Sequence, residues 1–143
     1  MIPVDGRVTP HGAYLYERTY KPGSPVHAGL DLGASQGAEV RAPADGEVVV
    51  VDMVGKKGSG WHGYAPVVVI ETRDGFFHLL AHLGAVKVSL GEKVAAGELV
   101  GTVGPERHCH WEVRYKLRAG VPSWKRTIDP MGWERGEVRP AVV

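Results

Sequence analysis

Two histidines flank the only cysteine of the chain in the segment RHCHWEV, which runs from Arg107 to Val113. An imidazole can bind a metal ion or move a proton near neutral pH, and a thiolate can bind a metal ion or act as a nucleophile. The residue types of this segment therefore fit three interpretations. His108, Cys109 and His110 belong to a metal site, to a thiol site, or to a strand that carries them for structural reasons.

Two other segments carry polar side chains at a spacing of four residues. His27 and Asp31 stand at the ends of HAGLD, which has the form H-x-G-x-D, and His78 and His82 stand at the ends of HLLAH. Residues i and i+4 of an extended segment lie on the same face, so each pair can converge on one ion or substrate. Imidazole and carboxylate are usual ligands of Zn²⁺, which keeps a fourth position open in catalytic sites. Each motif alone also fits an ordinary surface or turn histidine.

The residues from His108 to Tyr115 are predicted to form a strand, because apolar and charged residues alternate along the second half of this segment. Successive side chains of a strand point to opposite faces. One face then carries the polar residues His108, His110, Glu112 and Arg114. The other face carries Cys109, Trp111, Val113 and Tyr115, which is the composition of a core face. Cys109 is therefore interpreted as a small buried residue.

Short strands must position these residues. Three β-branched runs, Glu47–Val54, Val67–Thr72 and Leu99–Val103, lie between frequent glycines and prolines. Residues 73–75 (Arg-Asp-Gly) are predicted to form a hairpin turn, and residues 42–46 to form a turn before a strand. No stretch shows a sustained helical period. The pattern predicts an all-β fold, an antiparallel β-barrel or β-sandwich.

The length of 143 residues predicts a single domain, with a core over about residues 26–116 and a C-terminal tail over residues 117–143. One cysteine excludes an internal disulfide. The formal net charge of +1 and the mixing of acidic and basic residues argue against a nucleic-acid partner. No apolar run approaches the roughly 20 residues of a membrane span, and the first residues lack the pattern of a signal peptide. We expect a monomer.

Five segments together resemble the M23 metallopeptidases of the lysostaphin and LytM type. HAGLD, LLAHL and HCHWEV are similar to the three signature segments of that family, in the same order and at similar spacing. VRAPADGEVVVV resembles the A-P-x-x-G-x-V strand of the family, and VSLGEKVAAGELVGTVG resembles its glycine-spaced segment. The resemblance implies the lysostaphin-like, duplicated hybrid form of the antiparallel β-fold. It also implies a zinc-dependent endopeptidase that hydrolyses peptide bonds in bacterial peptidoglycan.

The resemblance further implies roles for single residues. His27, Asp31 and His110 would bind one Zn²⁺ per chain, His82 and His108 would be catalytic, and the partner would be a peptide stem or cross-bridge of the cell wall. The chain has no H-E-x-x-H segment, so no glutamate is placed as the base in the manner of thermolysin-like enzymes. Because His108 shares a strand face with His110, we predict that His108 is the general base. His82 is then predicted to orient water and stabilise the oxyanion.

Some positions depart from the family's pattern. Leu80 stands where relatives usually have a tyrosine, and residues 104–107 replace a longer loop, which affects specificity more than chemistry. The tail contains Trp124 and Trp133, which are expected to fix it against the β-structure.

Three further residues keep alternative interpretations. His78 is either a partner of the site or a structural or exposed residue. Tyr20 either stabilises the oxyanion or packs in the fold. Trp61, beside His62 in the glycine-rich segment GKKGSGWHGYAP, either lines the substrate groove and stacks on substrate or has no such role.

Two other classes of protein remain as alternatives. The first is a non-catalytic M23-like binding or activator domain. The second is a biotinyl or lipoyl carrier, because VSLGEKVAAGELVGTV also resembles such modules, although Lys56 and Lys57 are poorly placed for the attachment lysine. The setting that the sequence suggests is the cell wall, either for a phage lysis or tail-associated enzyme or for a domain of a longer bacterial protein.

Overall fold

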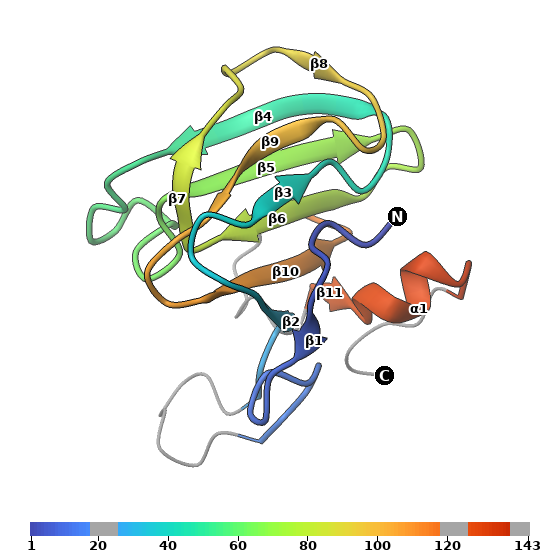
Figure 1. Ribbon diagram of the computed structural model, residues 1–143. Coiled ribbons are helices and arrows are strands. Elements are labelled where there is room, and N and C mark those ends of the chain that lie inside the picture. Colours follow the sequence, from blue (N-terminus) through green and yellow to red (C-terminus); the bar gives the residue numbers. More distant parts are fainter. Residues whose placement is uncertain (18–25, 118–125, 138–143) are drawn as a thin grey trace.

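A computed structural model describes residues 1–17, 26–117 and 126–137. Within these residues the chain forms strands and one short helix, α1 (Pro130–Glu134), as Figure 1 shows. The strands are β1 (Arg7–Val8), β2 (Leu30–Gly33), β3 (Glu39–Arg41), β4 (Gly46–Asp52), β5 (Val67–Thr72), β6 (Phe77–Ala81), β7 (Leu83–Val86), β8 (Lys93–Val94), β9 (Leu99–Val103), β10 (His108–Arg114) and β11 (Thr127–Ile128).

The predicted strands form where the β-branched runs lie. The bounds of β5 and β9 are those predicted, and β10 ends one residue before the predicted end at Tyr115. β4 ends at Asp52, before the predicted end at Val54. The side-chain Oδ1 of Asp52 accepts hydrogen bonds from the backbone N–H groups of Val54 and Gly55, both at 2.8 Å. A carboxylate that accepts backbone N–H groups two and three residues on closes a turn, which ends the strand. The predicted hairpin turn at residues 73–75 is also present. It joins the paired strands β5 and β6, with Gly75 at φ +84°.

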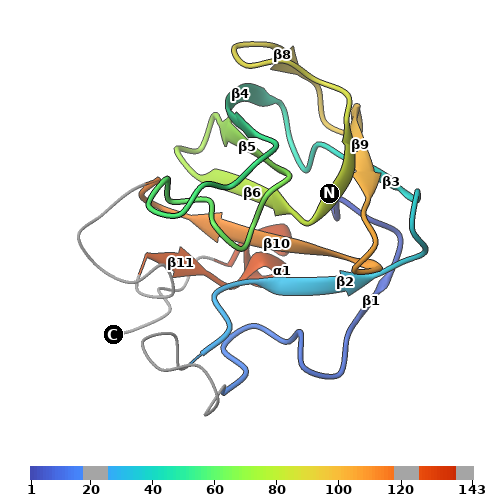
Figure 2. The same ribbon diagram turned by 90° about the vertical axis from the view of Figure 1, so that its left-hand side faces the viewer.

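The strands form two antiparallel sheets that stack as a sandwich. The larger sheet has eight strands in the order β1-β2-β10-β6-β5-β4-β8, with β11 paired to β10. The smaller sheet has the order β3-β9-β7. Figure 2 shows the stack from the side, and the end strands β1 and β8 lie far apart. The prediction of an all-β antiparallel fold is confirmed, and it takes the form of an open sandwich rather than a closed barrel.

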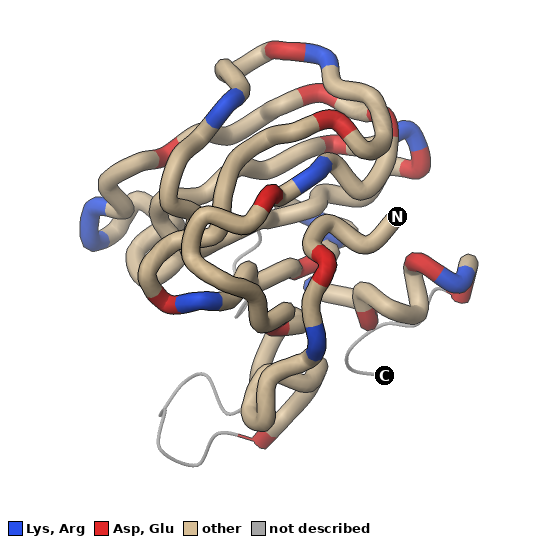
Figure 3. The backbone as a smooth tube through the Cα atoms, viewed as in Figure 1, with Lys and Arg blue, Asp and Glu red and all other residues tan. Residues whose placement is uncertain are grey.

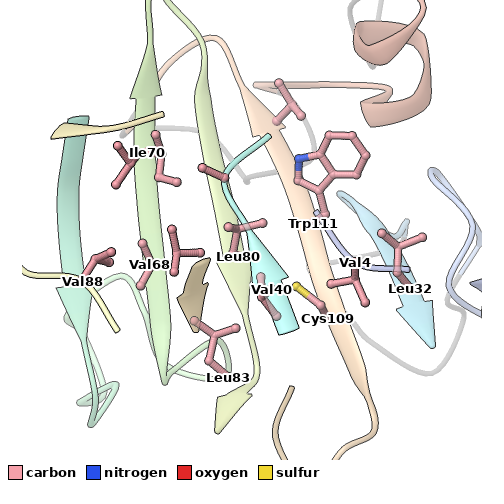
Figure 4. Packing of buried hydrophobic residues seen from close by; sticks show 14 of the residues in the cluster. Val4, Leu32, Val40, Val68, Ile70, Leu80, Leu83, Val88, Cys109 and Trp111 are labelled. Carbon is pink, nitrogen blue, oxygen red and sulfur yellow. The ribbon is translucent and has the colours of Figure 1, made fainter. Parts of the chain in front are cut away.

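The main hydrophobic core lies between the two sheets. Figure 4 shows Cys109 and Trp111 of β10 on the same side as Leu80 of β6 and Val68 of β5, with Val40 of β3 facing them. All five side chains are buried, and Cys109 has no exposed surface. The predicted core face of β10 is therefore confirmed for Cys109, Trp111 and Val113. Tyr115, which was predicted to share this face, follows the end of β10 and is 41% exposed, so that part of the prediction is wrong.

The opposite face of the larger sheet is also covered. A second apolar cluster lies there and consists of Trp61, Val67, Val69, Leu79 and Ala81. Leu79 and Ala81 pair directly with Glu112 and His110, and directly opposed side chains of a sheet share a face. The polar side chains of β10 thus lie beside this second cluster, and the exposed fractions of His110, Glu112 and Arg114 are 5%, 0% and 1%.

The C-terminal part packs against the sandwich. Asp129 caps α1 by accepting the backbone N–H of Met131 at 3.1 Å, and Pro130 begins the helix. Trp133 of α1 donates its indole N–H to Asp74 in the β5–β6 turn at 2.7 Å and packs against the main core. The expectation that Trp133 fixes the tail is confirmed, whereas Trp124 lies outside the described residues.

Charged residues of both signs are mixed over the described surface. Figure 3 shows Lys and Arg interspersed with Asp and Glu along the backbone. In the described ranges, no helix has the length and apolar character needed to cross a membrane.

Candidate metal centre

Pairing of β2 with β10 brings two candidate ligands together. Asp31 of β2 lies directly opposite His110 of β10 in the antiparallel register, so the two side chains point to the same face. His27 lies just before β2, where its backbone N–H donates to the carbonyl of Tyr16 at 2.9 Å. The chain bends at Gly29 between His27 and Asp31. His27 therefore reaches the same point from beyond the end of the strand.

His27, Asp31 and His110 form a triangle of possible ligand atoms. His110 Nδ1 lies 2.9 Å from Asp31 Oδ1 and 3.1 Å from His27 Nε2. His27 Nε2 lies 3.3 Å from Asp31 Oδ1. Ligand atoms of a tetrahedral Zn²⁺ with bonds of about 2.0–2.1 Å stand about 3.3–3.4 Å apart. The triangle is therefore slightly smaller than a zinc site, and it is the cluster in residues 1–17, 26–117 and 126–137 that could hold a metal ion.

Each histidine of the triangle is oriented by a hydrogen bond on its other ring nitrogen. His27 Nδ1 lies 3.1 Å from the carbonyl of Ala13, to which it donates, and this leaves Nε2 as the nitrogen that faces the triangle. His110 Nε2 lies 2.9 Å from Oε1 of Glu112, which leaves Nδ1 in the triangle. Partners of this kind fix the tautomer and the ring orientation of metal-binding histidines.

Gly29 of the H-x-G-x-D segment allows His110 to pack against the chain. A Cβ atom at this position would lie 2.6 Å from the carbonyl oxygen of Trp111 and 2.9 Å from Nε2 of His110. Distances below 3.0 Å are clashes, so a larger residue would displace the imidazole or the backbone. The close approach of His110 and the Trp111 carbonyl therefore explains why position 29 is a glycine.

The triangle is electrostatically coupled to Glu112. Burial would raise the pKa of Asp31, but hydrogen bonds with His110 and His27 hold it well below its usual range. Burial would lower the pKa of His110, but hydrogen bonds with Asp31 and Glu112 raise it to about 9. Burial would raise the pKa of Glu112, but Arg114 and His110 lower it to about 2. Without a metal ion, His110 is thus an imidazolium held between two carboxylates.

His108 lies at the open side of the triangle. Its Nδ1 is 3.1 Å from the carbonyl of Glu106, to which it donates, and its Nε2 is 3.9 Å from Oδ2 of Asp31. The side chain is 25% exposed, so its Nε2 can meet a substrate or water beside the candidate ligands. The ring of His82 lies close by, with its centroid 5.2 Å from that of His108.

His82 occupies a left-handed backbone conformation, which is uncommon for residues other than glycine. It follows the end of β6 with φ +58°, and its backbone N–H donates to the carbonyl of Tyr64 at 2.9 Å. Its ring centroid is 6.1 Å from that of His110. Burial, together with repulsion from His110 and His108, lowers the pKa of His82 to about 4, so this imidazole is neutral at neutral pH.

His78 does not belong to the site. The left-handed conformation of His82 breaks the strand alternation that would place the two histidines on one face. His78 pairs with Val113 on the core face of the sheet and is fully buried. Its Nδ1 accepts the indole N–H of Trp111 at 3.1 Å, and its ring contacts Trp133 at a centroid distance of 4.3 Å. The structural interpretation of His78 is confirmed, and the alternative as a partner of the site is wrong.

Trp61 is a packing residue. Its exposed fraction is 4%, it belongs to the second apolar cluster, and the guanidinium of Arg114 lies 5.5 Å from its ring centre. Because the indole is covered by protein, the interpretation that Trp61 stacks on substrate is wrong. His62 is exposed, with Nδ1 3.1 Å from the carbonyl of Gly55. Tyr20 lies outside the described residues.

Glu112, Arg114 and Tyr64 lie at the site, although no role was predicted for them from the sequence. Tyr64 donates its hydroxyl to Oε1 of Glu112 at 3.3 Å, and Arg114 donates its Nε–H to Oε2 of the same carboxylate. The sequence does hold a signal for two of them. Histidine, glutamate and arginine recur at every second position in HWEVR, which places them on one strand face.

An antiparallel β-sandwich thus brings together two buried histidines and a partly buried aspartate that could hold a metal ion. The family model described as peptidase family M23 matches residues 25–123. This chain therefore belongs to peptidase family M23. The carrier interpretation of the glycine-spaced segment is replaced by this assignment.

Two curated relatives are named for different activities. The DD-carboxypeptidase/endopeptidase Mpg of Neisseria meningitidis serogroup B is 39% identical over 94 residues, which cover 62% of this chain and 20% of the relative. The murein hydrolase activator EnvC of Escherichia coli K12 is 38% identical over 105 residues, which cover 73% of this chain and 23% of the relative. The chain thus spans about a fifth of the length of the curated relatives that it matches. One relative is thus named as a peptidase and the other as an activator of murein hydrolases.

Two solved structures share the fold. The catalytic domain of lysostaphin from Staphylococcus simulans has a TM-score of 0.73 and 19% identity, and the match covers 92% of this chain and 93% of that chain. A zinc-containing peptidase from Vibrio cholerae has a TM-score of 0.64 and 26% identity, and the match covers 84% of this chain and 39% of that chain. The lysostaphin-like form of the all-β fold is therefore confirmed.

Proposed function

We propose that this chain is a zinc-dependent endopeptidase that hydrolyses peptide bonds in bacterial peptidoglycan. The observation that carries the proposal is the triangle of His27, Asp31 and His110, with separations of 2.9–3.3 Å between one ligand atom of each residue. Membership of family M23, the endopeptidase among the relatives and the zinc-containing peptidase among the solved structures support it.

The donor set fits Zn²⁺. Two imidazole nitrogens and one carboxylate oxygen are the ligand types of catalytic zinc sites, and His27 and His110 each have the second ring nitrogen hydrogen-bonded. Zn²⁺ held by these residues would supply a Lewis acid that lowers the pKa of water and polarises a carbonyl group.

The remaining histidines would move protons. The hydrogen bond from Nδ1 of His108 to Glu106 leaves Nε2 of His108 as a proton acceptor beside Asp31, so this atom would take the proton of the attacking water. His82 is neutral because its pKa is about 4, and a neutral imidazole carries one N–H group. That group would orient water and donate to the oxygen that becomes negative in the transition state.

The resemblance to the activator EnvC favours a second candidate function. A non-catalytic domain would bind a peptidoglycan hydrolase or the wall itself without cleaving a bond. This chain has all three possible ligands, and it also has His82 and His108. A non-catalytic activator would not need these five residues. Zinc content and cleavage therefore separate the two functions.

The test compares wild type with His110→Ala, His108→Ala and the exposed control His62→Ala, each purified without added metal. We expect about one zinc per chain in wild type, His108→Ala and His62→Ala, and far less in His110→Ala. Cleavage of purified peptidoglycan should be lost in His110→Ala and His108→Ala and kept in the control. A well-folded wild type that takes up no zinc would overturn the peptidase proposal and favour the activator. Loss of zinc with slow residual cleavage in His108→Ala would exchange the roles of His108 and His110.

A further inference from the structure

A row of three buried polar side chains lies along one face of β10. His110, Glu112 and Arg114 stand at alternate positions and are at most 5% exposed. Burying ionic groups is costly unless each group is paired and hydrogen-bonded. Only His110 belongs to the triangle, so the triangle alone gives no reason to bury Glu112 and Arg114 behind it.

Both oxygens of Glu112 are in use. Oε1 accepts from Nε2 of His110 at 2.9 Å and from the hydroxyl of Tyr64 at 3.3 Å. Oε2 accepts the Nε–H of Arg114. The carboxylate is therefore held from three sides, and its position leaves little freedom to the imidazole to which it is bonded.

Arg114 is itself fixed in place. Its guanidinium donates to the carbonyl of Leu117 at 3.0 Å. It also lies 5.5 Å from the ring centre of Trp61 and 5.7 Å from that of Tyr64, within the range of cation–π contacts. The aromatic residues of the loop between β4 and β5 thus clamp the cation that holds Glu112.

The contacts of Glu112 determine which nitrogen of His110 can meet a metal ion. With Nε2 bonded to Glu112, Nδ1 is the nitrogen beside Asp31 and His27. A ring turned by half a rotation would point Nδ1 away from both of them. Removing the carboxylate would therefore loosen the triangle at one corner.

We propose that Glu112 is the positioning residue of the metal centre, held by Arg114 and Tyr64, and that it fixes the ring of His110 with Nδ1 towards the ion. The proposal rests on the proposed zinc site. Tyr64 also contacts His82, because the Tyr64 carbonyl accepts the backbone N–H of His82 at 2.9 Å. One residue of the loop thereby contacts both the partner of a ligand and a residue proposed to be catalytic.

The test measures the zinc dissociation constant by chelator competition for Glu112→Ala, Glu112→Gln and Leu79→Ala. Leu79 is the matched control, because it lies directly opposite Glu112 on the same face and is fully buried but apolar. We expect Glu112→Ala to weaken zinc binding about 10–100-fold. Glu112→Gln should weaken it less, because the amide oxygen can still accept from Nε2 of His110. Leu79→Ala should lower thermal stability and leave the dissociation constant within about twofold of wild type.

A spectroscopic measurement separates positioning from plain stabilisation. The visible absorption of the Co²⁺-substituted protein reports coordination geometry, and we expect it to change in Glu112→Ala but not in Leu79→Ala. A wild-type dissociation constant and spectrum in Glu112→Ala, with reduced stability alone, would overturn the proposal. If Glu112→Ala does not fold, Glu112→Gln and Tyr64→Phe decide, and wild-type zinc binding in both would overturn it. If wild type itself binds no zinc, the proposed function fails; if wild type binds zinc and the Glu112 variants match it, only this inference fails.

Discussion

His110 links the protonation of the candidate metal centre to its affinity for a metal ion. Burial lowers the pKa of this imidazole, but hydrogen bonds with Asp31 and Glu112 raise it to about 9 in the absence of metal. Nδ1 must lose its proton before it can bind zinc. Below a pH of about 9, we therefore expect the zinc dissociation constant to rise about tenfold for each unit by which the pH falls.

Chelator competition between about pH 7 and pH 8.5 measures this dependence, and calorimetry in two buffers measures the protons released, which should number about one per zinc. Glu112→Gln removes one of the two carboxylates, so its dissociation constant should depend less steeply on pH near neutrality. A constant affinity for wild type over this range would contradict the imidazolium at His110.

Gly29 offers a test of packing at the scale of a single atom. The added methyl group of Gly29→Ala would lie 2.6 Å from the carbonyl of Trp111 and 2.9 Å from Nε2 of His110. We expect a loss of roughly 1–3 kcal/mol of stability from overpacking and weaker zinc binding, because the imidazole must shift. Gly33→Ala, at the end of β2, is the control, because its nearest contact is 3.3 Å, to a side-chain methyl of Thr9. Equal effects of the two substitutions on zinc binding, measured by chelator competition, would count against this account.

At the scale of the element, β10 separates thiol chemistry from metal chemistry. Cys109 points into the main core between two histidines that point the other way, and burial raises the pKa of its thiol to about 12. We expect the folded protein to be inert to a thiol reagent such as Ellman's reagent and the denatured protein to react with one equivalent. Cys109→Ala should keep full zinc content. Rapid reaction of the native thiol, or loss of zinc in Cys109→Ala, would show that this face of β10 is open.

The alternation of residue types along β10 predicted which residues share each face of the strand. It did not predict that the polar face is buried. Charged residues at every second position are typical of a face in water, whereas Glu112 and Arg114 are buried. What covers them is the loop that carries Trp61 and Tyr64, which lies about 50 residues earlier in the chain. A pairing over that distance leaves no local pattern, so the sequence revealed the charges but not their burial.

The same alternation failed at the end of β6. It placed His78 and His82 on one face, but the strand ends at Ala81 and His82 takes a left-handed conformation. No local sequence pattern predicts this left-handed conformation, because histidine adopts positive φ only occasionally. Helix α1 was not predicted, although Asp129 and Pro130 are a typical N-cap and first-turn pair.

At the scale of the whole molecule, His78 connects the larger sheet with the C-terminal helix. It contacts Trp111 of β10 and Trp133 of α1 and is fully buried, and burial lowers its pKa to about 4 although Asp74 opposes this. The pKa in the folded state is thus below that of the unfolded chain. The neutral form therefore contributes stability that is complete above about pH 6.5 and is lost as the pH falls towards about 4.

Urea unfolding at about pH 7.5 and about pH 5 tests this coupling. We expect the loss of stability between these values to be about 2 kcal/mol smaller in His78→Gln than in wild type. His82, whose pKa is also lowered to about 4, contributes in the same direction, so some acid sensitivity should persist. His62→Gln, at an exposed histidine, is the control. An identical loss in His78→Gln and wild type would indicate that the pKa of His78 is not depressed.

The pairing of β2 with β10 also governs when the metal centre comes into existence. Asp31 and His110 are 79 positions apart, and His27 and His110 are 83 apart. While the ribosome is still synthesising the chain, the first two groups have emerged long before the third. A nascent polypeptide that ends before β10 therefore has no complete site, however well its earlier strands have paired. Any capability that depends on the triangle is withheld until β10 has been synthesised and has paired with β2, because this pairing brings Asp31 and His110 together.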